Sequence, residues 1–401
     1  MRLVKKIIHG IAWRARRVIG RMHKCYTLKF RYPAIYQKES RKPVKEKAVF
    51  LERRGVQLSD NFELVYEELK KRGDIELVSC FIGEGRLGRW EQWKNNAAFI
   101  KEIATAKYVF INDSTTLVSC IEPRPETKIV QLWHACGAFK KFGYSTADKI
   151  FGGSRKELEQ FPLHKNFSLV TVSSPEVIWA YAEAFHMEDK KENIVAAGIS
   201  RTDVFFDKGK IQAAYEKVHQ LVPQSCNKKI ILYAPTFRGR VACAESPDKM
   251  NLVKMKKALG DEYVILNKHH PFVKQRPEIS KEVQDFSIDV TDILTIEELL
   301  MVSDICISDY SSLIFEYSLF ERPMLFFAYD LDEYFDWRGF YYDYSEMTPG
   351  PVCKTTEDII DYIENLKTKF DRQKIVDFRE KFMSSCDGKS TQRILEMVLG
   401  N

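Results

Sequence analysis

Residues 302–327, VSDICISDYSSLIFEYSLFERPMLFF, constrain the fold more than any other stretch of the chain. The apolar run 305–307 predicts a buried strand, and the polar turn 308–312 follows it directly. Residues 313–320 predict an apolar helix, and 324–327 predict the next buried strand. Strand, turn, helix and strand in this order are typical of a parallel α/β sheet. The serines of the turn either cap their own helix or help its N–H groups to bind a phosphate.

The same alternation runs through the rest of the chain and restarts after about residue 200. A chain of 401 residues can hold two cores, so the pattern predicts two α/β domains with a ligand in the cleft between them. A helix at 371–399 is expected to close the chain. The other expected strands are 47–51, 77–82, 108–111, 128–132, 169–172, 229–233, 263–267 and 288–290, and the other expected helices are 61–72, 90–106 and 250–259.

Cysteine usage and hydropathy exclude two classes of protein. The nine cysteines are scattered without a CxxC or Cys/His ligand spacing, so we expect reduced thiols and no metal site. No run of about eighteen apolar residues occurs, so no segment is expected to span a bilayer.

The N-terminal residues 2–24 predict a basic amphipathic helix. Apolar residues recur every three or four positions, and no acidic residue occurs before Glu39. Such a helix suits an anionic membrane surface, whereas a terminal helix packed on its own domain and a nucleic-acid arm are the alternatives. No nucleic-acid-binding signature supports the last. The arginines expected to dock are Arg14, Arg16, Arg17 and Arg21, and a polar linker is expected at 31–46.

Two histidines follow expected strands, at the sheet edge where parallel sheets bind ligands. His134 comes after 128–132, where an imidazole can act as general base on an alcohol. His270 comes after 263–267 beside a proline, where it can donate a proton or hydrogen bond to a phosphate oxygen. A histidine bonded to a neighbouring carbonyl and a solvated loop histidine are the alternatives. Arg238 and the pair Arg338–Gly339 supply further cations in loops of this kind.

The order of six motifs resembles the CDP-glycerol glycerophosphotransferase family of teichoic acid synthesis. These motifs are WHACGAFKKFG, GISRTD, YAPTFR, KHHP, SDYSS, and YD followed by RGFYYDY. The resemblance implies a GT-B-like fold of two Rossmann-type domains. An amphipathic helix at 1–30 would precede an acceptor-side domain at 31–200 and a CDP-alditol-binding domain at 201–401.

The resemblance also implies the site residues. His134 and His270 would be catalytic, and the donor-binding set would be Arg238, Lys268, Ser308, Asp309, Ser311, Ser312, Arg338 and Gly339. This chain departs from the family pattern after its first motif histidine, where it has Ala135-Cys136-Gly137-Ala138. That loop is expected to face the acceptor, so acceptor identity is the property it puts in doubt.

The expected reaction transfers glycerol phosphate, or a related alditol phosphate, from a CDP-linked donor to a hydroxyl of a polyprenyl-diphosphate-linked acceptor, with release of CMP. The enzyme would sit peripherally on the cytoplasmic face of the membrane. A GT-B glycosyltransferase using a nucleotide sugar and an inactive membrane-bound scaffold are the alternatives. The choices between CDP-glycerol and CDP-ribitol, primase and polymerase, and teichoic acid and capsule stay open. No cofactor is implied, and a divalent metal requirement also stays open.

Overall fold

The computed structural model describes residues 15–149, 152–239 and 243–400, with the side chains of 335–338 left out of that description. Contacts divide the chain into two compact units. Unit 1 comprises Met1–His134, Gly153–Val170 and Leu395–Asn401, and unit 2 comprises Ala135–Gly152 and Thr171–Ile394. This division differs from a single boundary near residue 200, because residues 135–152 and 171–200 group with unit 2. The assignment of acceptor and donor to the two domains stays a prediction.

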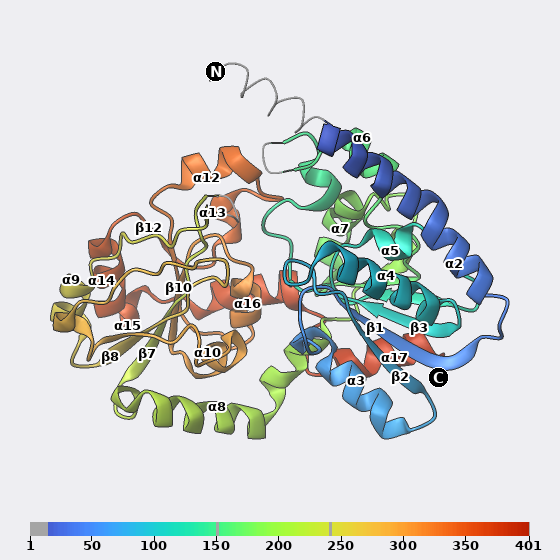
Figure 1. The fold of residues 1–401 in the computed structure, drawn as a ribbon. Helices are drawn as coiled ribbons and strands as arrows, with labels where there is room; N and C mark the ends of the chain where they lie inside the picture. Colours follow the sequence, from blue (N-terminus) through green and yellow to red (C-terminus); the bar gives the residue numbers. More distant parts are fainter. Residues whose placement is uncertain (1–14, 150–151, 240–242, 401) are drawn as a thin grey trace, which may run out of the picture. The chain divides into compact units, whose positions relative to one another are not determined.

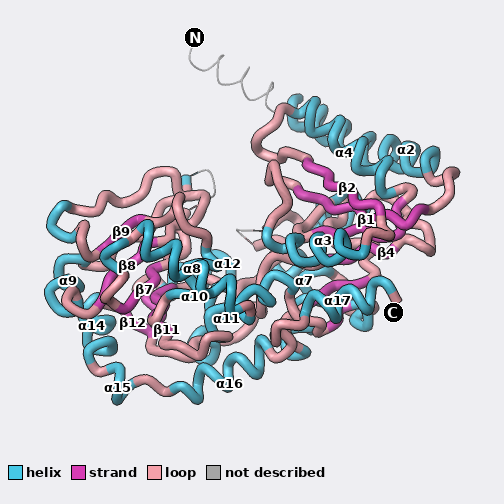
Figure 2. Tube along the Cα trace, turned by 90° about the horizontal axis from the view of Figure 1, so that it is seen from below, coloured by secondary structure: helices cyan, strands magenta, loops and turns pink. Residues whose placement is uncertain are grey.

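Two six-stranded sheets form the framework (Figures 1 and 2). The first has the order β2-β1-β3-β4-β5-β6 and the second the order β12-β11-β10-β7-β8-β9. The strand pairs from β2 to β5 in the first sheet and from β12 to β9 in the second are parallel, as the alternating pattern predicts. The strands are β1 (Lys45–Glu52), β2 (Glu76–Phe81), β3 (Ala106–Ile111), β4 (Lys128–Gln131), β5 (Leu169–Thr171), β6 (Ile194–Val195), β7 (Lys229–Tyr233), β8 (Tyr263–Asn267), β9 (Ser287–Asp289), β10 (Ile305–Ser308), β11 (Met324–Phe327) and β12 (Val352–Cys353).

The helices connect these strands, and several begin at a side-chain cap. Asp207 caps α8, and Thr295 forms a capping box with Glu298 at the start of α10. The helices are α2 (Tyr32–Glu39), α3 (Asp60–Arg72), α4 (Arg89–Ile103), α5 (Thr116–Ser119), α6 (Arg155–Gln160), α7 (Ile178–Phe185), α8 (Lys208–Leu221), α9 (Leu252–Leu259), α10 (Ile296–Val302), α11 (Leu313–Ser318), α12 (Leu331–Arg338), α13 (Tyr344–Met347), α14 (Thr356–Glu364), α15 (Leu366–Lys369), α16 (Arg372–Met383) and α17 (Ser390–Leu399).

Strand order reverses once in each sheet, and this places the candidate sites. In the first sheet the chain runs from β1 outward to β2 and returns across to β3, so β1 and β3 flank the reversal. Right-handed crossovers then put α3 and α4 on opposite faces of the sheet, as Figure 2 shows. In the second sheet β7 and β10 flank the reversal in the same way. Ligands of open parallel sheets bind outside the carboxyl ends of such strand pairs.

Apolar side chains of β7, β8, β10 and β11 bury one face of the second sheet against α9 and α14. Ile231, Ile265 and Ile307 are fully buried in this cluster with Met255 and Ile359. In the first sheet Phe50 stacks on Phe110, with ring centroids 4.9 Å apart. These cores hold the carboxyl ends of the strands in fixed register.

Two sequence predictions about helices are wrong. The expected linker at 31–46 contains α2, which begins with a proline in its first turn and buries Tyr32 and Tyr36. The expected single helix at 371–399 is two helices, α16 and α17. Gly388 adopts a φ of 84° in the loop between them, a conformation that a continuous right-handed helix does not contain.

The N-terminal helix is described from residue 15. Residues 15–26 are α-helical and continue into a π-helical turn, Thr27–Arg31. Among the described residues, no helix is both long and apolar enough to cross a membrane.

Candidate functional site

The ends of β7 and β10 are joined by the buried carboxylate of Asp309. Its Oδ1 atom accepts the main-chain N–H groups of Thr236 at 2.9 Å and Tyr310 at 2.6 Å. The hydroxyl of Ser308 donates to the carbonyl of Ala234 at 2.8 Å. Asp309 and Ser308 therefore fix the loops at the strand reversal, and both are nearly inaccessible.

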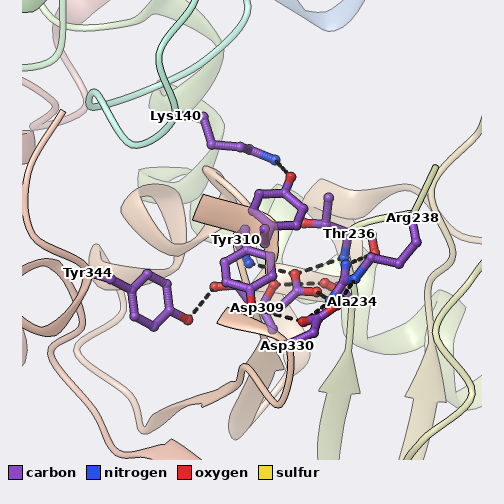
Figure 3. Close-up of polar contacts among 10 residues, drawn as sticks. Lys140, Ala234, Thr236, Arg238, Asp309, Tyr310, Asp330 and Tyr344 are labelled. Carbon is purple, nitrogen blue, oxygen red and sulfur yellow. Dashed lines mark hydrogen bonds and ion pairs between the residues drawn. The ribbon is translucent and has the colours of Figure 1, made fainter. Parts of the chain in front are cut away.

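Arg238 lies over this junction and pairs with two carboxylates (Figure 3). Its Nη2 is 2.9 Å from Oδ2 of Asp309, and its Nε is 2.5 Å from Oδ2 of Asp330. The hydroxyl of Tyr310 also donates to Asp330 at 2.9 Å. Burial has the largest single effect on the pKa of the Arg238 guanidinium and lowers it. The two carboxylates together outweigh burial, so the pKa is raised. One guanidinium faces two carboxylates, so the cluster carries net negative charge.

The serines of the polar turn have different surroundings. Ser311 and Ser312 are half-buried, and the Ser311 hydroxyl accepts the N–H of Leu313 at 3.4 Å. Ser312 is the N-cap residue of α11 without a side-chain cap bond. The hydroxyls of this turn are therefore less buried than Ser308 and Asp309 in the same predicted phosphate site.

His270 is held as a neutral imidazole with its proton on Nε2. Its Nδ1 accepts the N–H of Phe272 at 3.2 Å, so the other ring nitrogen is the donor. The rings of Phe237 and Phe272 lie 4.8 and 4.7 Å from it, centroid to centroid. Burial, followed by the charge of Lys140, lowers the pKa of His270 to about 4. At neutral pH this histidine can donate a hydrogen bond to a phosphate oxygen.

Lys268 binds main chain. Its ammonium donates to the carbonyls of Thr291 at 2.8 Å and Leu294 at 2.5 Å. The predicted donor-binding cation therefore holds the loop before α10. Burial lowers its pKa.

The pair Arg338–Gly339 ends α12. The side chain of Arg338 lies outside the described residues, so its predicted role stays a prediction. Gly339 has a φ of 79°, and its carbonyl accepts the N–H of Lys141 at 3.1 Å. The main chain of this motif thus contacts the segment that follows His134 in sequence.

In unit 1, His134 is exposed at the carboxyl end of β4. Its Nδ1 is 2.8 Å from the carbonyl oxygen of Asn112, which follows β3. A carbonyl only accepts hydrogen bonds, so Nδ1 carries the proton, and in the neutral imidazole the lone pair is then on Nε2. This is the tautomer that a general base acting through Nε2 requires.

The residue before His134 has an unusual backbone. Trp133 has a φ of 55°, which a bulky L-residue rarely adopts. The fully buried Gln131 stabilises it, because its Oε1 accepts the N–H of Trp133 at 2.9 Å while its Nε2 donates to the carbonyl of Asp113 at 3.2 Å. A strained residue locked beside a chemically active one is typical of functional sites.

Arg53, at the end of β1, repeats the arrangement of Arg238. It contacts Glu84 at 2.5 Å and Asp113 at 3.1 Å. In each unit an arginine after the first strand of the sheet is bound by two carboxylates from other loops. Neither arginine had a carboxylate partner assigned from sequence, because those partners come from distant segments.

The loop after His134 is packed at the positions where this chain departs from the family pattern. Cys136, Gly137 and Ala138 are buried in unit 2, and the expectation that the loop faces the acceptor stays a prediction. The N–H of Gly137 donates to the hydroxyl of Ser173 at 2.9 Å, and a Cβ at Gly137 would overlap the ring of Phe315. The residues at the departure from the family pattern thus have a packing role in unit 2.

The remaining site predictions concern membrane and metal. Arg16, Arg17 and Arg21 are exposed, and Arg14 lies outside the described residues. Within the described ranges, no three His, Cys, Asp or Glu side chains gather in a way that could hold a metal ion. Sequence reasoning left Gln131, Lys140, Tyr310, Asp330 and Tyr334 out of the site. For Asp330 the sequence does contain a signal for a site residue, because it follows the buried strand β11 closely.

Comparison with known proteins identifies relatives over nearly the whole chain. The family model described as CDP-glycerol:poly(glycerophosphate) glycerophosphotransferase matches residues 34–400. A teichoic acid ribitol-phosphate primase of Bacillus spizizenii is 37% identical over 88% of this chain and 90% of its own length. A teichoic acid poly(ribitol-phosphate) polymerase of the same organism is 37% identical over 89% of this chain, which spans 57% of that longer protein.

More distant relatives extend the pattern. A teichoic acid glycerol-phosphate primase of Bacillus subtilis is 31% identical over 77% of this chain and 78% of its own length. The solved structure of the wall teichoic acid polymerase TagF superposes with a TM-score of 0.76 over 98% of this chain and 97% of that chain, at 24% identity. That likeness confirms the predicted fold of two Rossmann-type α/β domains.

Proposed function

The chain belongs to the CDP-glycerol:poly(glycerophosphate) glycerophosphotransferase family, and from that membership we propose that it transfers ribitol phosphate from CDP-ribitol to a hydroxyl of a lipid-linked acceptor. It is a transferase of teichoic acid synthesis that uses a CDP-linked alditol donor. The observation that favours ribitol over glycerol is the higher identity to the ribitol-phosphate primase, 37% against 31% for the glycerol-phosphate primase.

In the proposed reaction, the acceptor hydroxyl attacks the β-phosphorus of the donor. The new oxygen–phosphorus bond forms as the bond to CMP breaks, and a phosphodiester results. Nε2 of His134 accepts the hydroxyl proton, a role that its bond to the Asn112 carbonyl supports. Phosphoryl transfer otherwise depends on positioning and on neutralising charge.

On the donor side, the Nε2–H of His270 donates to a diphosphate oxygen. The hydroxyls and main-chain N–H groups of Ser311 and Ser312 bind the same group. Arg238, Asp309 and Asp330 hold the loops that present these donors, because the guanidinium is already paired with the two carboxylates.

We further infer that the enzyme docks peripherally on an anionic membrane through the helix at residues 15–31. Val18, Ile19 and Met22 are exposed on it, and Lys24 pairs with Glu157 of α6 at 2.8 Å. The polar side of the helix thus contacts its own unit, while apolar side chains are left for an interface.

The deciding experiment measures CMP release from CDP-ribitol and CDP-glycerol on a prenyl-diphosphate-linked acceptor, with the mass of the product. We expect faster release from CDP-ribitol and mass increments of ribitol phosphate, whose number separates primase from polymerase. His134→Gln should lower the rate by about 10²- to 10⁴-fold, the usual worth of a general base. Preference for CDP-glycerol would overturn the donor assignment. A product that gains a sugar without phosphate, from a nucleotide sugar, would favour the glycosyltransferase alternative.

A further inference from the structure

Of the cations predicted to bind the donor, the two whose side chains the structure describes are engaged with the protein itself. Arg238 is shared between Asp309 and Asp330, and the ammonium of Lys268 donates to two main-chain carbonyls. A diphosphate carries several negative charges, and its transfer requires cations at its oxygens. The net negative charge of the Arg238 cluster makes this requirement stronger.

Lys140 brings a cation to the same place from the segment after His134. Its main chain forms an antiparallel bridge with Phe340, and the flanking N–H of Tyr341 donates to the carbonyl of Phe139 at 3.1 Å. This bridge fixes the backbone of Lys140 beside the chain that follows α12. The position is therefore set by main-chain pairing within unit 2.

The side chain of Lys140 points to the polar turn. Its Nζ donates to the hydroxyl of Tyr334 at 3.1 Å, and the ring of Tyr334 stacks on Tyr310 with centroids 3.9 Å apart. Tyr310 lies between Asp309 and Ser311 in the turn itself. Figure 3 shows the Lys140 amine reaching toward this stack, above the Asp309–Arg238 pair. The ring of Tyr334 thus lies between the Lys140 ammonium and Tyr310 of the predicted phosphate site.

A second observation relates Lys140 to His270, the other group proposed to bind the donor. The positive charge of Lys140 lowers the pKa of His270, after the larger effect of burial. The other groups packed on this imidazole are the uncharged rings of Phe237 and Phe272. The charge of Lys140 therefore acts on the imidazole of His270, while its ammonium reaches the Tyr334–Tyr310 stack beside the serine turn.

We propose that Lys140 is a donor-binding residue whose ammonium binds the diphosphate of the CDP-alditol and stabilises the phosphate of the departing CMP. The inference rests on the proposed function for the identity of the donor. Lys140 acts through its positive charge and transfers no proton. Its bond to Tyr334 holds the ammonium in place before the donor binds, which lowers the entropy cost of the contact.

The competing explanation is that Lys140 only holds Tyr334. Tyr334→Phe separates the two, because it removes the hydroxyl and keeps the ammonium. If Lys140 acts through Tyr334 alone, Tyr334→Phe and Lys140→Gln should have equal effects. If Lys140 binds the diphosphate, Tyr334→Phe should have the smaller effect.

The experiment measures binding of CDP and of inorganic pyrophosphate to the full chain by calorimetry. Lys140→Gln should weaken both by about 10- to 100-fold, the range for one charge-assisted hydrogen bond, and Lys140→Arg should recover most of the loss. Lys141→Gln is the matched control, since it removes the neighbouring charge and should change binding less than about twofold. In the unliganded protein, NMR titration should show the pKa of His270 raised in Lys140→Gln and unchanged in Lys141→Gln.

Equal binding of both ligands by wild type and Lys140→Gln would overturn the inference, as would wild-type protein that binds neither ligand. A wild type that binds pyrophosphate through Lys140 but releases no CMP from either CDP-alditol would refute the proposed function and leave Lys140 as an anion-binding residue. The two failures are therefore distinguishable.

Discussion

The side-chain oxygen of Gln131 accepts the main-chain N–H of Trp133 at 2.9 Å and holds that residue in a left-handed conformation. His134 follows directly, with its Nδ1 bound to the Asn112 carbonyl. One buried amide thus fixes the turn that presents the proposed base. Gln131 is a positioning residue, because it acts on the substrate only through His134.

Gln131→Met keeps the side-chain volume and removes both hydrogen bonds of the amide. We expect a loss of about 1–3 kcal/mol in the free energy of unfolding, because the N–H of Trp133 and the carbonyl of Asp113 lose their partner. The kcat should fall while the KM for the donor stays near that of wild type. A double variant with His134→Gln should be no slower than His134→Gln alone, since both act on one step. Additive losses in turnover would contradict the positioning role.

Gly137 tests the finding that the loop after His134 is packed. Its φ is 59°, and an added Cβ would overlap the Phe315 ring, so Gly137→Ala should destabilise by about 1–3 kcal/mol. Gly153→Ala is the matched control, because a Cβ there meets nothing within 4 Å. Urea unfolding midpoints compare the two. Equal midpoints would mean that this loop is open and available to a ligand.

Arg238 should behave as a structural ion-pair partner. Arg238→Met leaves the carboxylate of Asp309, 2% exposed, without its guanidinium, and we expect a loss of about 3–5 kcal/mol in the free energy of unfolding. Asp330→Asn keeps the Arg238–Asp309 pair and should cost clearly less. If Arg238→Met weakened donor binding and left urea unfolding unchanged, the arginine would be a phosphate ligand after all.

The sheets were predictable from sequence because short apolar runs specify buried strands with little help from their surroundings. The predicted bounds of β7, β8 and β11 match the structure to the residue. The helix α2 was mistaken for a linker because its eight residues, YPAIYQKE, show little amphipathic periodicity. Tertiary burial of its two tyrosines stabilises it instead, and a local pattern does not contain that information.

The ion pairs of the site could not be predicted from the sequence for a related reason. Arg238 and Asp330 are 92 residues apart, and only the order of strands in the sheet brings them together. Asp203 of the GISRTD motif is similar, because its carboxylate accepts the N–H groups of Ser390 and Thr391 and so caps α17. A motif that identifies the family thus performs a structural task that its sequence does not reveal.

Acid should destabilise the fold through two buried neutral histidines. Burial lowers the pKa of His164 to about 3 and, with Lys140, that of His270 to about 4, against an ordinary histidine value of 6.5. As pH falls through the histidine pKa of the unfolded chain, the unfolded chain binds protons that the folded chain does not. The free energy of unfolding therefore decreases. The loss of stability is absent above the pKa of the unfolded chain, and it is complete once pH reaches the pKa values of the two histidines in the folded chain.

Urea unfolding at several pH values between about 7.5 and 4.5 measures this loss. His164→Phe is the informative variant, because His164 is buried against Trp133 and Phe167, and an apolar ring replaces one that must stay neutral. We expect the dependence of unfolding free energy on pH to become shallower. A slope equal to that of wild type would show that other groups cause the acid sensitivity.

The last prediction concerns membrane docking. It depends on which side chains of the N-terminal helix are exposed to solvent. Ile19 and Met22 are 65% and 67% exposed, and Phe30, two turns further on, is 64% exposed. Arg21 donates to Gln160 of α6 at 3.0 Å, so the polar side of the helix contacts unit 1. A helix that packed on its own core would bury the apolar residues instead.

Replacing Val18, Ile19 and Met22 together by serine should lower sedimentation with anionic vesicles at least about tenfold, because the apolar area available for insertion is lost. Ile293→Ser is the control, an exposed apolar residue of unit 2 that is 46% exposed. Turnover on a vesicle-borne acceptor should fall with binding, while turnover on a detergent-solubilised acceptor should stay the same. Unchanged sedimentation would reject the docking role, and self-association of the wild type that the serines abolish would assign the apolar stripe to a second copy of the chain.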